Sequence, residues 1–104
     1  MWVETVVCTA RRGRIARLRR LLEARQAMKR RCEGCLGAWV APGIGDKNLF
    51  LVQAIFVDEK SWKNASEKVS SQLDSKDGGI ESELGGPPLV GMFDAKSTDL
   101  KISD

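Results

Sequence analysis

The sequence predicts a single α+β domain whose strands and helices follow the order β-α-β-β-α-β. Four short segments rich in β-branched and aromatic residues alternate with two segments whose apolar residues recur at three- and four-residue steps. Only a few turn-forming residues separate the two middle apolar segments, which is typical of an antiparallel hairpin. A chain of 104 residues fits one domain with one core, and we place it at residues 1–97, followed by a tail at 98–104.

The first strand is expected at residues 2–9, because its residues are β-branched or aromatic and alternate between two partly apolar faces. Trp2 and Glu4 share one of these faces. A long helix is expected at 13–32, with an apolar stripe that includes Leu18 and Leu22. Thr9 is the candidate for its N-terminal cap, and Gly34 indicates its end.

The hairpin strands are expected at 35–41 and 48–57, and the second of them is apolar on both faces, which predicts a central strand covered on both sides. Asp58 should cap a second helix at 59–73. Residues 74–88 contain four glycines and two prolines and predict a loop with a short helical turn near 80–84. The last strand is expected at 89–96.

This order predicts a ferredoxin-like arrangement, with a four-stranded antiparallel sheet and both helices on one of its faces. Two helices cover one face only, yet both faces carry apolar residues. Because a large apolar surface is rarely left in water, we expect a homodimer that packs sheet against sheet.

The composition excludes several kinds of chemistry. The chain has no histidine and no tyrosine, so Ser-His and Cys-His nucleophile pairs and a phenolic acid are ruled out. Its three cysteines give no disulfide framework and fit a reducing, cytoplasmic compartment. Cys32 and Cys35 have the spacing of a redox or metal motif, but they follow a helix instead of preceding one and have no second ligand pair. We therefore expect a structural role for them and no metal site. No segment is long and apolar enough for a membrane span, and no signal peptide opens the chain, so we expect no membrane partner.

The arginines are concentrated in the first third of the sequence. Residues 1–31 hold all nine arginines and Lys29 against two glutamates. Nucleic-acid binding through the Arg-rich helix at 11–31 is one interpretation. A solvated helix face is favoured, because no aromatic side chain lies between Trp2 and Trp39 to stack on bases. On the sequence alone we expect no nucleic-acid partner.

Two segments carry a family resemblance. Residues 31–37, Arg-Cys-Glu-Gly-Cys-Leu-Gly, follow the long helix, and residues 49–62 run from an apolar strand into the second helix. Both resemble the corresponding parts of the antibiotic biosynthesis monooxygenase (ABM) domain family. With the element order, the resemblance covers nearly the whole chain. It implies a dimeric α+β barrel and a small-molecule-binding domain, with cofactor-free oxygenation of an aromatic substrate as the candidate activity and no cofactor expected.

The chain departs from the active members of that family. The haem-degrading branch uses an Asn, a Trp and a His, and this chain has no histidine. The cofactor-free monooxygenases often use Tyr, which is also missing. The resemblance therefore leaves open whether the protein is an enzyme, and a non-catalytic ligand-binding or stress-related module is the alternative.

Candidate site residues come from the aromatic and out-of-place polar positions. Trp39, Trp62 and Asn64 are the candidates for catalysis. An aromatic residue at strand or helix spacing is more often part of the core, so both tryptophans have that alternative role. Three further positions are the candidates for ligand binding: Gln53, Glu4 and Phe50. Gln53 lies in a strand expected to be buried and needs hydrogen-bond partners, either a ligand or a residue across the dimer interface.

Overall fold

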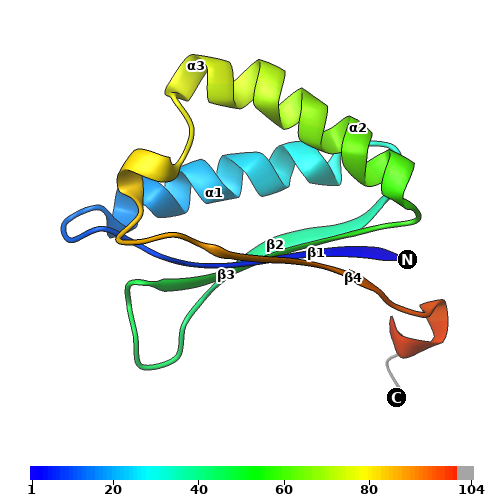
Figure 1. Cartoon of the computed structure of the whole chain (residues 1–104), viewed down its shortest axis with the longest axis horizontal. Coiled ribbons are helices and arrows are strands. Elements are labelled where there is room, and N and C mark those ends of the chain that lie inside the picture. Colours follow the sequence, from blue (N-terminus) through cyan, green and yellow to red (C-terminus); the bar gives the residue numbers. More distant parts are fainter. Residues whose placement is uncertain (101–104) are drawn as a thin grey trace.

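The computed structural model describes residues 1–100 and has the predicted element order. Strands β1 (Trp2–Thr9), β2 (Cys35–Pro42), β3 (Leu49–Phe56) and β4 (Leu89–Asp94) form one antiparallel sheet in the order β2-β3-β1-β4. Helices α1 (Ile15–Arg30) and α2 (Glu59–Val69) lie together on one face of this sheet (Figure 1). The ferredoxin-like fold is confirmed.

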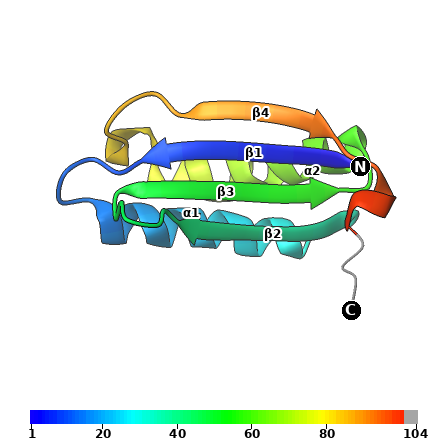
Figure 2. The same cartoon turned by 90° about the horizontal axis from the view of Figure 1, so that it is seen from below.

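The sheet has an inner face, which points toward the helices, and an open face, which α1 and α2 leave uncovered (Figure 2). Strand register places alternate residues on the two faces. The inner face carries Trp2, Glu4, Val6 and Cys8 of β1 and the residues of β3 that pair with them: Phe56, Ala54, Val52 and Phe50. The core lies between this face and α1, where Leu18 and Leu22 are buried. Since β3 is covered by helices on its inner face only, the expectation of cover on both sides is not met within the single chain.

The start of α1 differs from the prediction. Thr9 is the last residue of β1, so the expectation that it caps the helix was wrong. The chain makes a turn through Gly13, which has a positive φ of 79°, and Arg14 takes the N-cap position without a side-chain hydrogen bond. No acidic residue lies in the first turn, so the positive end of the helix dipole is left without a compensating charge there.

The end of α1 follows the predicted signals. The helix ends at Arg30, and Gly34 takes a left-handed conformation with φ of 83°. A Cβ atom at position 34 would collide with the side chain of Ser61 on α2. Glycine is therefore required here both for its backbone conformation and for the close approach of the turn after α1 to Ser61 of α2.

The α2 region begins as predicted and ends later. The carboxylate of Asp58 accepts a hydrogen bond of 2.8 Å from the Ser61 backbone N–H, which confirms the cap and lowers the pKa of Asp58. After α2, the chain stays helical through a wide π turn (Ser70–Asp74) and a last α turn, α3 (Ser75–Asp77). The predicted end at residue 73 was too early, because Asp74 and Asp77 are both held by an arginine of α1, which the local pattern does not reveal.

The loop and the last strand follow the prediction closely. A 3-10 turn at Glu81–Glu83 lies within the expected short helical turn, and β4 ends two residues earlier than predicted. Residues Ser97–Leu100 form a further 3-10 turn, and the rest of the expected tail lies outside the described residues. Within residues 1–100, no helix has the length and apolar character needed to cross a membrane.

Candidate ligand-binding site

Two tryptophans meet on the inner face, one from the sheet and one from the helix layer. The ring centroids of Trp2 on β1 and Trp62 on α2 are 5.3 Å apart, with an angle of 31° between the rings. The indole N–H of Trp62 donates a 2.8 Å hydrogen bond to Oε2 of Glu4. The indole nitrogen of Trp2 is buried and has no hydrogen-bond partner among the described residues. A buried donor without a partner is costly, so this N–H is a group that a ligand could satisfy.

A buried ion pair lies beside the tryptophans. Nζ of Lys29, in the last turn of α1, is 2.6 Å from Oε1 of Glu4 on β1. The side chains of Lys29 and Glu4 are 11% and 12% exposed. Burial of two charges carries a desolvation penalty that their attraction offsets only when the remaining polar atoms are also hydrogen-bonded. Glu4 meets this condition, because each of its carboxylate oxygens has a donor.

Two apolar residues on the inner face of β4 lie open to solvent. Met92 pairs with Glu4 and Val90 pairs with Val6, so both point to the helix side of the sheet. They are nevertheless 36% and 59% exposed, because the two helices pack mainly on β2 and β3. An apolar strip therefore runs along the sheet edge next to the Glu4 carboxylate.

A pocket lies at the beginning of this strip. It has a volume of about 480 Å³, and its walls are largely apolar or glycine and proline: Ile80, Glu81, Leu84, Gly86, Pro87 and Pro88. Pro88 immediately precedes β4. Pockets of this size and composition are typical of small-molecule sites.

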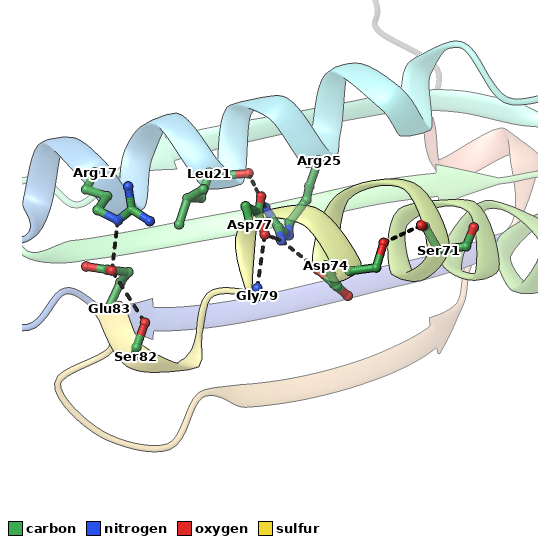
Figure 3. Close-up of polar contacts among 10 residues, drawn as sticks. Arg17, Leu21, Arg25, Ser71, Asp74, Asp77, Gly79, Ser82 and Glu83 are labelled. Carbon is green, nitrogen blue, oxygen red and sulfur yellow. Dashed lines mark hydrogen bonds and ion pairs between the residues drawn. The ribbon is translucent and has the colours of Figure 1, made fainter.

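Two arginines of α1 hold the segment that walls this pocket (Figure 3). Arg25, whose side chain is 8% exposed, donates hydrogen bonds of 2.6 Å to Asp74 and of 2.8 and 3.1 Å to the two carboxylate oxygens of Asp77. Arg17 donates a 2.9 Å hydrogen bond to Glu83. These bonds lower the pKa of Asp77 and of Glu83. We call the contacts of Arg25 and Arg17 with these carboxylates the arginine latch, and it fixes residues 74–83 against α1.

The structure brings together two of the residues that the sequence predicts for the site and separates the others. Trp62 and Glu4 are hydrogen-bonded on the inner face. Trp39 lies on the open face and is 39% exposed. Gln53 also lies there and donates a 3.2 Å hydrogen bond to the hydroxyl of Thr5. Neither side chain points into the space between the sheet and the helices.

The remaining two predicted residues also lie apart from the tryptophan pair. Phe50 is 1% exposed and belongs to the core beneath α1. Asn64 is exposed on α2 and lines a different pocket, of about 360 Å³, with Cys32, Glu33 and Lys68 among the other residues. The three residues proposed for catalysis, Trp39, Trp62 and Asn64, therefore do not form one constellation in this chain.

Sequence reasoning missed Trp2, Lys29 and Met92. The alternation of β1 already placed Trp2 on the same face as Glu4. Lys29 is the only lysine in a helix otherwise rich in arginine, and it continues the stripe of Leu18, Leu22 and Arg25 at four- and three-residue steps. That spacing was a usable signal for a buried cation.

The cysteines have structural positions. Cys32 packs against the core and its thiol lies 3.3 Å from the Met28 carbonyl oxygen, while Cys35 begins β2. All three cysteines are free, and burial raises the pKa of the Cys35 thiol, which disfavours the reactive thiolate. Residues 1–100 contain no cluster of three or more His, Cys, Asp or Glu side chains that could hold a metal ion.

Comparison with known proteins relates this arrangement to solved structures. A scan against protein-family models and a search of curated proteins found no match. A proposed antibiotic biosynthesis monooxygenase from Deinococcus radiodurans matches with a TM-score of 0.81 at 15% identity over 100% of both chains. SnoaB, a cofactor-independent oxygenase from Streptomyces nogalater, studied as a mutant, matches with a TM-score of 0.77 at 14% identity over 96% of this chain and 97% of SnoaB.

The chain has the fold of the antibiotic biosynthesis monooxygenases. PA3566 from Pseudomonas aeruginosa, at 20% identity, matches with a TM-score of 0.76 over 92% of this chain and 94% of PA3566. The predicted resemblance is thus confirmed at the level of the fold. Within this ABM fold, the tryptophan pair and the Glu4–Lys29 ion pair lie between the sheet and the helix layer.

Proposed function

We propose that the protein binds an electron-rich aromatic molecule on the inner face of its sheet and oxygenates it without a cofactor. The observation that carries this proposal is the pair of Trp2 and Trp62 placed directly beside the buried Glu4–Lys29 ion pair. Indole rings 5.3 Å apart offer aromatic surface for a flat ligand, and offset or tilted contacts between rings are favourable. The likeness in fold to a cofactor-independent oxygenase supports the chemistry.

The reaction balances without a redox group from the protein. A hydroxylated anthracene in its keto form has an activated ring methylene. Molecular oxygen converts that CH₂ to a carbonyl, with one oxygen atom entering the product and the other leaving with the two hydrogens as water. The substrate supplies all the electrons, so the protein needs only to orient it and to exclude water. In this proposal Trp2 and Trp62 hold the rings, the free Trp2 N–H donates to a ligand oxygen, and Met92 adds apolar contact.

We also propose that the protein works as a homodimer in which two open faces pack together. The open face carries large exposed apolar side chains, with Trp39 at 39%, Phe93 at 58% and Leu89 at 74% exposure. Apolar patches of this kind are typical of protein interfaces. A second copy also supplies the missing cover for the open face of β3.

Oxygen uptake tests the catalytic proposal. We expect the wild-type protein to consume one O₂ for each carbonyl formed from a hydroxylated anthracene. Trp62→Phe should lower the rate by at least about tenfold, which corresponds to a loss of about 1.4 kcal/mol of transition-state stabilisation. Trp39→Phe and Asn64→Ala should leave the rate within about twofold. A larger loss in either of these two variants than in Trp62→Phe would assign the chemistry elsewhere and overturn the inner-face site.

One observation favours a second candidate, a ligand-binding module without catalysis. Both carboxylate oxygens of Glu4 already have donors, so the most buried acid of the site is not a free general base. If this candidate is correct, hydroxylated anthracenes raise the melting temperature of the protein without any oxygen uptake. Failure to bind at all would reject both candidates.

A further inference from the structure

Seven of the nine arginines fall into two sets, one with acidic partners and one without. The other two, Arg11 and Arg30, donate to the backbone carbonyl oxygens of Ser82 and Ala38. Arg17 and Arg25 turn toward the segment 74–83, where their partners are Glu83, Asp74 and Asp77 (Figure 3). Arg14 belongs to the same set, because its Nε lies 3.6 Å from a carboxylate oxygen of Glu83. A second set is exposed and has no hydrogen-bond or ion-pair partner within residues 1–100. Its members are Arg12, Arg19, Arg20 and Arg31. Glu23 is the acid of α1 nearest to this second set, one turn after Arg19 and Arg20, and no ion pair within residues 1–100 joins it to either.

The second set forms an elongated cationic surface, which we call the outer face of α1. Arg31 comes eleven positions after Arg20, which is close to three helical turns, so these two side chains leave the same side of the helix about 16 Å apart. Arg19 leaves the helix about 100° from Arg20, and Arg12 precedes the helix. Glu23 is the only acidic residue of α1. Glu23 lies on the same face, one turn after Arg19 and Arg20, so the surface carries four arginines and one carboxylate and is net positive.

The side chains between these arginines are small. Ala16 and Ala24 are exposed, and Ala27 is partly exposed. An anionic membrane surface is bound most firmly when large apolar residues enter the lipid, and alanine adds little of that contact. Aromatic residues for stacking on single-stranded bases are also absent from α1. Apart from the carboxylate of Glu23, the outer face offers guanidinium groups and small side chains.

We infer that the outer face of α1 binds the phosphodiester backbone of double-stranded nucleic acid without reading its sequence. Guanidinium groups form bidentate hydrogen bonds with phosphate oxygens, and every positive charge on this face is an arginine, since Lys29 is buried in the ion pair with Glu4. A duplex carries one charge per about 1.7 Å of its axis, so a 16 Å row of guanidinium groups faces about ten phosphate charges. Twelve of the fourteen acidic residues follow position 31, and their repulsion would turn the outer face toward the duplex.

This inference revises the expectation from sequence, and the reason is structural. In the sequence all nine arginines look alike. In the structure, the acidic segment 74–83 satisfies one set and leaves the other facing solvent. The inference is independent of the inner-face site, because α1 contributes to that site from its opposite side through Lys29.

Fluorescence anisotropy with a labelled duplex of about 20 base pairs tests the inference. We expect binding at low salt, with log K falling against log salt at a slope of about −3 to −4, the value for four neutralised phosphates. The variant Arg19→Glu/Arg20→Glu should weaken binding at least about thirtyfold, because it removes two contacts and adds two repulsive charges. The matched control Lys60→Glu/Lys63→Glu makes the same change in net charge on exposed residues of α2 and should stay within about threefold.

Three results would overturn the inference. One is an absence of binding to the duplex at about 25 mM salt, where unscreened phosphate contacts are strongest. Another is an equal loss in the α2 control, which would show a response to net charge only. The third is equal or tighter binding to poly-glutamate or to vesicles containing phosphatidylserine, which would assign the outer face to an acidic protein or a membrane. Unchanged circular dichroism in both variants excludes a folding defect.

Discussion

The buried ion pair between Lys29 and Glu4 gives the sharpest prediction about the inner-face site. Lys29→Met keeps the length of the side chain and removes its charge, so the Glu4 carboxylate stays buried with the Trp62 N–H as its remaining donor. Breaking a buried pair by removing one partner costs about 3–5 kcal/mol. Because Glu4 keeps one hydrogen bond, we expect a loss near the lower end, about 3 kcal/mol.

Urea denaturation at pH 7 and fixed protein concentration measures this loss, since the slope of the transition reports whether unfolding stays two-state. The double variant Glu4→Gln/Lys29→Met removes both charges, and the amide oxygen can still accept from Trp62. We expect it to recover most of the loss and to lie within about 1 kcal/mol of the wild type. The control Lys63→Met, at an exposed position of α2, should change the stability by less than about 0.5 kcal/mol.

The reasoning fails if Lys29→Met costs less than about 1 kcal/mol, because the ion pair would then be solvated in solution. It also fails if the double variant is no more stable than the single one. That result would mean that Lys29 contributes through packing of its chain and that the charge on Glu4 is irrelevant.

Three further predictions concern the latch, the open face and the helix junction. Arg25→Met should cost about 2 kcal/mol, because the released carboxylates regain only part of their lost hydrogen bonding from water. Arg25 lowers the pKa of Asp77 in the folded state. The stability that this ion pair contributes is therefore complete above the ordinary pKa of about 3.9 and is lost as the pH falls through the lower folded-state pKa. Between pH 6 and pH 2, the urea midpoint should fall less steeply in Arg25→Met than in the wild type. Phe93→Glu should give a sedimenting monomer where the wild type is a dimer, and a dimeric variant would reject open-face packing. Gly34→Ala should lower the free energy of unfolding by about 2 kcal/mol or more in the same urea assay, because position 34 has a left-handed backbone and its new Cβ would collide with Ser61. A loss under about 0.5 kcal/mol would show that the turn after α1 and helix α2 move apart at little cost.

The fold could be predicted because its signals are local. Alternation in residues 2–9 gave the bounds of β1, and Asp58 followed by a helical stripe gave the start of α2. Helix ends were predicted less well where the deciding contact is distant. The chain stays helical to Asp77 because Arg25 binds Asp74 and Asp77, which lie about fifty residues further along, and no periodicity shows such a pair.

The candidate site was predicted only in part, for a reason of parity. Alternation shows which residues of one strand share a face, but it does not say which face the helices cover. Trp39 and Trp62 therefore seemed able to meet. Register decides otherwise, since Trp39 pairs with Gln53 and Gln53 pairs with Thr5, all on the open face. Glu4 has the opposite parity to Thr5, and for that reason it meets Trp62 on the inner face.

Helix α1 contributes residues both to the proposed inner-face site and to the proposed duplex-binding surface, and the two sets of residues can be changed independently. One side of the helix is tied down: Leu18 and Leu22 fill the core, and Lys29 reaches Glu4. The other side carries Arg19 and Arg20, whose exposed side chains make no hydrogen bond or ion pair within residues 1–100. Because Arg19 and Arg20 are exposed and Lys29 is buried, charge reversal at Arg19 and Arg20 should weaken duplex binding at least about thirtyfold while leaving the affinity of the inner face for an aromatic ligand unchanged. Lys29→Met should do the reverse, and a variant that impaired both would mean that the two sides of α1 are coupled.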